Sequence, residues 1–285
     1  MSKIIVTADS TCDLGEELKA RYEVTYYPLH VILNGKQYND GVDITPDEIY
    51  ENYYANHTLP STAAVNVDEY LAFFKQYTDA GYQVIHVNLG SGLSSCHQNA
   101  RLAAGELEGV YVIDGQNLST GMGLVVIEVA KRVQAGMEAE QIVAEVEALR
   151  TKCHASFILE NLEFLHKGGR CSAVAVMGAN LLKLKPQILV DNTSGKMDAA
   201  KKYRGSFSKA LAEYVADELK DRTDVETDRI FITHSGMTDP SILEQAVALV
   251  KQYQNPDEIC VTRASCTISS HCGPNTIGVL YMHRD

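Results

Sequence analysis

Short apolar, β-branched runs alternate with helical patterns along the first half of the chain, and this alternation constrains the fold more than any other feature. Strands are predicted at Lys3–Ala8, Gln83–Leu89 and Val110–Ile113, with helical patterns between and after them. Strands connected through helices usually lie parallel in one sheet. The pattern therefore predicts an N-terminal three-layer α/β/α arrangement around a mostly parallel, doubly wound sheet.

Two local signals refine this prediction. The segment Tyr26–Leu33 reads as one strand, and Asn34-Gly35 after it is typical of a type I′ hairpin turn. The segment Thr45-Pro46-Asp47-Glu48 predicts a helix start, because threonine can cap the helix, proline suits its first position and glutamate completes a capping box. A hairpin followed by a helix is therefore expected after the second strand.

The second half has a different texture. A short strand is predicted at Ser156–Leu159, and helices are predicted at Leu162–Gly169 and Ser172–Leu182. Later strands are joined by both hairpins and helices, which favours a mixed sheet with helices on one face. We therefore predict two domains, an N-terminal parallel α/β domain at 1–152 and a C-terminal mixed-sheet α/β domain at 153–285.

The charge balance excludes several classes of partner. The chain of 285 residues has 37 acidic residues against 25 Lys and Arg, a formal net charge of -12. Such a surface repels phosphate backbones and anionic headgroups, so neither nucleic acid nor a membrane is an expected partner. No apolar run approaches the roughly 20 residues that span a bilayer. No export signal precedes Ile4, so we expect a cytoplasmic protein without stable membrane insertion.

The cysteines predict no metal or redox site. Seven are present, and no two have C-x-x-C spacing. Cys266 and Cys272 are the nearest pair, with His271 beside the second, but a metal there would lack two further ligands at readable spacing. Buried, unreactive thiols are the expectation.

The segments that follow predicted strands are candidates for ligand binding, because ligands of open parallel sheets bind beyond the carboxyl ends of the strands. These segments are rich in small hydroxyl donors and lie at 9–11, 90–95, 114 and 234–236. The loop at 90–95 opens a helix, whose free N–H groups suit an anion. It is not a nucleotide-binding motif, since Ser95 stands where glycine is required. A flexible turn with a serine N-cap explains these residues equally well.

The segment Lys167-Gly168-Gly169-Arg170 is open to two interpretations. The glycine pair can end a helix, with the cations near its carbonyl end. Alternatively, the segment presents Arg170 at a ligand entrance or a partner surface.

Several motifs together resemble the DegV family of bacterial fatty acid-binding proteins, and the similarity extends over nearly the whole chain. Its most specific part lies between 162 and 186, where Leu162-Glu163, Gly168-Gly169-Arg170 and Lys185-Pro186 occur in order. The other matching segments are 6–11, Thr62, 91–95 with Gln98, 203–205, and 271–274 with Gly278.

This resemblance implies two α/β domains with a long-chain fatty acid in the cleft between them. Family members resemble carriers and not enzymes, and they need no further cofactor. They present the carboxylate of the bound acid to a separate fatty acid kinase subunit. On this pattern the carboxylate contacts are Thr62, Ser94, Ser95 and His271. Pocket or entrance positions are Ser10, Ser91 and Gly273, and Arg170 and Arg204 face the kinase.

Several residues depart from the family pattern, among them Ser95, Cys96 and His97, where the family favours glycine, threonine and tyrosine. Ala63 and Ala64 follow Thr62 where the family usually has serine and glutamine, Cys272 replaces threonine after the histidine, and Asn275 replaces a glycine.

Two other functions compete with a carrier. One is a hydrolase or phosphotransferase with Ser94 or Cys272 as nucleophile and His271 as base, which requires the base within hydrogen-bond reach. The other is a sensor whose ligand changes its affinity for a protein partner.

Overall fold

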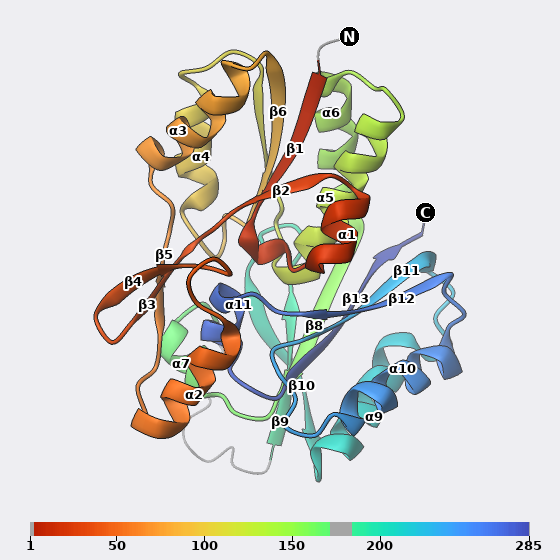
Figure 1. Cartoon of the computed structure of the whole chain (residues 1–285). Helices are drawn as coiled ribbons and strands as arrows, with labels where there is room; N and C mark the ends of the chain where they lie inside the picture. The colour runs from red at the N-terminus through yellow and green to blue at the C-terminus, as the bar shows by residue number, and fades with distance from the viewer. Residues whose placement is uncertain (1–2, 172–183, 285) are drawn as a thin grey trace.

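The computed structural model describes residues 3–171 and 184–284, and within them the strands form three sheets (Figure 1). We call them the parallel sheet, the mixed sheet and the small sheet. The helix predicted at Ser172–Leu182 lies outside the described residues. No helix of the described part is both long enough and apolar enough to cross a bilayer.

The parallel sheet has the order β2-β1-β6-β7, and every neighbouring pair is parallel. Helices α3 and α4 pack on one face, and α5 and α6 pack on the other (Figure 1). The predicted three-layer arrangement is therefore confirmed. Its elements are β1 (Lys3–Asp9), β2 (Val24–Tyr27), β6 (Tyr82–Asn88), β7 (Val110–Asp114), α1 (Gly15–Arg21), α3 (Val67–Thr78), α4 (Cys96–Ala104), α5 (Ser119–Gln134) and α6 (Ala139–Leu149), with short 3-10 turns at Ser10–Cys12 and Arg150–Lys152.

The mixed sheet has the order β10-β9-β8-β13-β11-β12; β11 and β12 are parallel and the other neighbours are antiparallel. Helices α9 and α10 cover one face over a separate hydrophobic cluster, as predicted, and α5 packs against the other face. The elements are β8 (Cys153–Leu159), β9 (Leu184–Val190), β10 (Met197–Arg204), β11 (Val225–His234), β12 (Glu258–Arg263), β13 (Thr276–His283), α9 (Phe207–Leu219) and α10 (Ser241–Tyr253).

The small sheet corrects one prediction. The single strand expected at Tyr26–Leu33 is wrong, because β2 ends at Tyr27 in the parallel sheet and β3 (His30–Leu33) begins a different sheet. Pro28 between them lacks the N–H that a continuing strand would donate. The predicted turn is confirmed by positive φ at Asn34 and Gly35, and β4 (Lys36–Asn39) and β5 (Ser61–Ala63) flank β3.

Three further helices pack beside the small sheet. Helix α2 (Pro46–Asn56) has the predicted capping box, with the Thr45 side chain accepting from the N–H of Glu48. Beside it lie α7 (Glu163–Gly168) and α11 (Cys266–Cys272), the latter unpredicted, and the three share a cluster that includes Phe164.

Two buried carboxylates of the N-terminal half hold the start of α11. Asp13 accepts from the N–H of Ser265 at 2.9 Å, and Asp40 accepts from the N–H groups of Cys266 and Thr267 at 2.7 and 3.1 Å. Negative charge at a helix N-terminus is favourable. A helix encoded near the chain end is thereby fixed against the first forty residues.

The main hydrophobic core runs through both halves. It joins Val6 of the parallel sheet to Phe157 and Phe231 of the mixed sheet, with α5 between the two sheets. The mixed sheet begins at Cys153, and the division into 1–152 and 153–285 stays a prediction.

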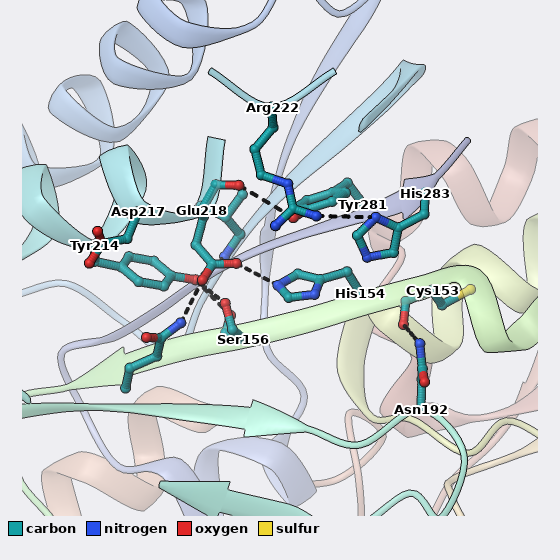
Figure 2. A network of polar contacts seen from close by, with 12 residues as sticks. Cys153, His154, Ser156, Asn192, Tyr214, Asp217, Glu218, Arg222, Tyr281 and His283 are labelled. Carbon is teal, nitrogen blue, oxygen red and sulfur yellow. Dashed lines mark hydrogen bonds and ion pairs between the residues drawn. The ribbon is translucent and has the colours of Figure 1, made fainter. Parts of the chain in front are cut away.

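A polar network lies between α9 and the mixed sheet, on the face of the sheet that points away from α5 (Figure 2). Glu218 points from α9 toward His154 on β8, with which it is hydrogen-bonded, and its other oxygen accepts from Gln187 at 2.5 Å. The His154 ring stacks on Tyr281, with ring centroids 4.7 Å apart. These contacts join α9 to three strands of the sheet.

Candidate functional site

Two adjoining cavities lie between the parallel sheet and the mixed sheet. The outer cavity has a volume of about 170 Å³ and is lined by β5, the loop at 90–95, Arg170 and α11. The inner cavity, of about 30 Å³, lies between the start of α5 and the mixed sheet. Leu118, Ile268 and Cys272 line both cavities, so the two meet there.

Thr62 and His271 form a polar pair in the wall of the outer cavity. The Thr62 hydroxyl lies 2.7 Å from Nε2 of His271, although the two residues are 209 positions apart. Burial, together with the positive charge of Arg170, lowers the pKa of His271 to about 4. The imidazole is therefore neutral at physiological pH and offers a hydrogen bond without a full charge.

Gly168 lies directly against the His271 ring. A Cβ at position 168 would collide with Nδ1, an atom that is buried and has no hydrogen-bond partner among the described residues. Gly169 next to it ends α7 in the left-handed conformation, with φ of +66°. The pair thus combines a helix cap, which the sequence predicts, with a contact to His271 that it does not.

We expect Gly168→Ala to displace the His271 ring and to reduce ligand retention several-fold, because adding a methyl group to a packed site costs about 1–3 kcal/mol. The ligand content of purified protein, measured by mass spectrometry, checks this. Gly169→Ala is the control, since it strains a left-handed residue but would meet nothing within 4 Å. Equal ligand loss in both variants would argue against a role for Gly168 in placing His271.

The N-terminus of α4 forms another wall of the outer cavity through Ser94 and Ser95. Ser94 Oγ accepts from the N–H of Cys96 at 3.2 Å and faces the cavity at the start of the helix. Ser95 occupies the N-cap position but makes no capping hydrogen bond through its side chain. Serine hydroxyls and the positive end of a helix dipole together suit an anionic group.

Gly92, within the same loop, has a structural reason to be glycine. A Cβ there would collide with the carbonyl oxygen of Ser194, at the tip of the β9–β10 hairpin. The hairpin of the C-terminal half therefore packs directly against the loop at 90–95.

Arg170 is exposed and lines the outer cavity, and we call this solvent end the entrance. Its guanidinium donates to the carbonyls of Gly168 at 2.7 Å and Leu93 at 3.4 Å. Arg204 is also exposed, at the end of β10, and is not among the described residues that line either cavity.

The remaining predicted pocket positions support loops around the cavities. Ser10 donates to Asp40 at 2.9 Å, and Ser91 donates to Asp114 at 2.5 Å. Gly273 has φ of +72°, and a Cβ there would lie 2.7 Å from the Phe164 ring. None of the three is among the described lining residues of the cavities.

The apolar wall was not singled out from the sequence. Leu29, Leu89, Leu93 and Leu118 line the outer cavity, and Ala63 and Ala64 leave space beside Thr62. The available signal was position, because these leucines lie just after strands or in the loops that follow them. In the described part of the chain, no group of three or more His, Cys, Asp or Glu is arranged to hold a metal.

The lowered pKa of His271 gives a pH prediction. Its folded pKa of about 4 lies below the usual 6.5, so the unfolded chain binds the extra proton first and stability falls as pH drops from about 6.5 to 4. The His271→Gln variant should lack this contribution to the fall in the free energy of unfolding, which amounts to roughly 3 kcal/mol at most. Urea unfolding at pH 7 and pH 4.5 measures it. The exposed His57→Gln variant should keep the wild-type difference, and an unchanged difference in His271→Gln would contradict the prediction.

Comparison with known proteins places these observations in a family. The family model described as an uncharacterised protein of the DegV family matches residues 3–284. A DegV domain-containing protein from Deinococcus radiodurans is 35% identical over 214 residues, 75% of each chain. One from Clostridium perfringens is 27% identical over the full length of both.

Solved structures agree over the whole chain. A fatty acid-binding DegV family protein from Thermus thermophilus has a TM-score of 0.87 at 29% identity, with 100% of both chains covered. A fatty acid-binding DegV family protein from Streptococcus agalactiae has a TM-score of 0.85 at 25% identity, also over 100% of both chains. The chain belongs to the DegV family.

Proposed function

We propose that this protein binds a long-chain fatty acid between its two large sheets and presents the carboxylate to a separate fatty acid kinase, without catalysis of its own. The observation that carries the proposal is the position of the Thr62–His271 pair and the α4 N-terminus at the outer end of an apolar cavity. Fatty acid binding by the Thermus thermophilus and Streptococcus agalactiae relatives supports it.

In this proposal the carboxylate lies among Thr62, Ser94, Ser95 and His271. A carboxylate left without donors in the cavity would cost several kcal/mol, and hydroxyl, imidazole and helix N–H groups satisfy it. Arg170 is the charged side chain among the described residues of the outer cavity, and it lies at the entrance. Ser10, Ser91 and Gly273 act by holding the surrounding loops.

The acyl chain extends from this group past Leu118 into the inner cavity. Burial of about 14 methylenes at ~0.8 kcal/mol each gives a gross gain of roughly 11 kcal/mol before the costs of association. That gain is enough for a carrier to retain its ligand through purification.

The chemistry of Cys272 and His271 favours a carrier over a hydrolase or phosphotransferase. Burial raises the pKa of the Cys272 thiol to about 12, which keeps it protonated and a poor nucleophile. Nε2 of His271 bonds to Thr62, whereas Ser94 Oγ accepts from the backbone N–H of Cys96. A nucleophile would need the base within hydrogen-bond reach.

Solvent extraction of the purified protein, with mass spectrometry, tests the function. We expect close to one long-chain fatty acid per chain and no turnover of acyl esters. Protein that carries no fatty acid and takes up none when it is offered, or that hydrolyses an ester, would overturn the proposal.

The partner is tested at Arg204, which is exposed and away from the cavities. We propose that the protein works in the cytoplasm and that Arg204 and Arg170 face the kinase. The chain has a net charge of -12, so these exposed cations stand out on its surface. Arg204→Glu should leave fatty acid content unchanged and slow phosphorylation of the bound acid by the kinase at least about tenfold, the effect of replacing favourable charge with repulsion. Lys251→Glu on α10 is the matched control. Equal rates in the two variants would refute the role of Arg204.

A further inference from the structure

The inner cavity has an almost wholly apolar wall, although five serine and threonine residues line it. A hydroxyl group exposed in such a cavity would offer a hydrogen bond to a polar ligand. Whether these hydroxyls are available depends on their partners within the protein. The five are Ser119, Ser156, Thr233, Ser235 and Thr276.

Two of these hydroxyls bond to buried side chains behind the cavity wall. Ser119 donates to the carboxylate of Asp13 at 2.6 Å. Ser156 Oγ lies 2.9 Å from the hydroxyl of Tyr214, which in turn donates to the Ser156 carbonyl. The hydroxyl groups of both serines are therefore hydrogen-bonded within the protein.

Thr233 lies in a chain of three threonines that links α5 to the mixed sheet. Its hydroxyl is 2.6 Å from that of Thr120 and 2.9 Å from that of Thr262. His234, which also lines the cavity, accepts at Nδ1 from the N–H of Gly236 at 3.2 Å. Thr233 and Nδ1 of His234 therefore both have partners within the protein.

The last two hydroxyls bond to the backbone that follows α11. Ser235 donates to the carbonyl of Gly273, and Thr276 donates to the carbonyl of Cys272 at 2.9 Å. All five hydroxyls are thus engaged within the protein, which explains why the cavity wall is apolar despite its composition.

We propose that the inner cavity receives the hydrocarbon end of the acyl chain and rejects chains that carry oxygen at that end. This inference rests on the proposed function and specifies its ligand class as fatty acids with an unsubstituted terminal methyl group. A terminal hydroxyl or second carboxyl would find no unengaged hydroxyl in the cavity, because each lining hydroxyl already has a partner within the protein. It could at most share a lone pair of one of them. A buried polar group without a hydrogen bond is disfavoured, and an apolar pocket rejects an added hydroxyl by about 100-fold.

The wild-type protein provides the first test. After removal of bound lipid, hexadecanoic acid and 16-hydroxyhexadecanoic acid, which share one chain length, compete for the site. We expect the unsubstituted acid to bind about 10- to 100-fold more tightly. Equal affinities would overturn the inference, whether because Nε2 of His234 supplies a donor or because the chain end lies elsewhere. Failure to bind hexadecanoic acid at all would instead overturn the proposed function.

Leu280 provides a matched pair of variants, because it lines the inner cavity from β13. Leu280→Thr places a hydroxyl without a partner in the cavity, and Leu280→Val removes similar volume without one. The preference for hexadecanoic acid should be at least about fivefold smaller in the threonine variant than in the valine variant, the effect of one added hydrogen bond. The same preference in both would show that hydroxyl availability does not control selection.

Discussion

Replacement of Thr62 with valine is expected to lower the affinity for the proposed fatty acid ligand by about 10- to 100-fold. Valine has nearly the shape of threonine and suits β5, so the pairing of Thr62 with Val31 should survive. The variant loses the hydroxyl that lies 2.7 Å from His271. With Nε2 protonated, His271 donates to this hydroxyl, whose own proton then serves the proposed carboxylate. A hydrogen bond to a charged group contributes about 1.5–3 kcal/mol. Fatty acid retained per chain, and affinity after removal of lipid, measure the loss.

Ser61→Ala is the control for this variant. Ser61 precedes Thr62 on β5, is exposed, and does not line either cavity among the described residues. It should retain wild-type lipid content and affinity. Wild-type retention by Thr62→Val would remove Thr62 from the site.

Replacement of Glu218 with alanine should cost roughly 3–5 kcal/mol of stability, because two polar side chains each lose a buried hydrogen-bond partner and a cavity is left. Glu218 is buried and bonds to both His154 and Gln187, so alanine strands two polar partners and leaves a cavity under α9. The melting temperature should fall by about 10 °C. Thermal unfolding followed by circular dichroism measures the change.

The loss should depend on pH in a defined direction. Burial alone would raise the pKa of Glu218, but hydrogen bonds and the charge of His154 outweigh it and the pKa is lowered from 4.5. A lowered carboxyl pKa contributes stability above about pH 4.5 that is lost as pH falls through the folded pKa. The difference between wild type and Glu218→Ala should therefore shrink in acid.

The neighbouring Asp217 is the matched control on α9. It is exposed, accepts from Tyr203 at 2.8 Å and pairs with Lys201 at 3.0 Å. Asp217→Ala should cost only about 1 kcal/mol, since exposed ion pairs contribute little. Equal losses in the two variants would mean that burial does not set the cost at Glu218.

Local chemistry was sufficient to predict much of the fold. The capping box at Thr45, the turn at Asn34 and Gly35, and the alternation of strands and helices depend on neighbouring residues, and the structure confirms them. The break at Pro28 was missed because the residues on both sides favour strand. The two strands differ in the sheet that each one joins, and that choice depends on contacts with residues far away in the sequence.

Helix α11 shows why the site was harder to predict than the fold. Its seven residues are rich in β-branched and small polar types that do not favour helix. Contacts with Asp13 and Asp40, more than 200 positions away, hold its first turn. The nearness of Thr62 to His271 followed from family resemblance, and no periodicity or spacing could have supplied it.

The attachment of α11 to Asp13 and Asp40 couples the site to long-range folding. Thr62 and His271 come from β5 and α11, so they pair only when α11 is docked on the N-terminal half. A molecule in which α11 had detached would lack one wall of the outer cavity. Any ligand held there would bind only the docked form, so it would raise the free energy of unfolding.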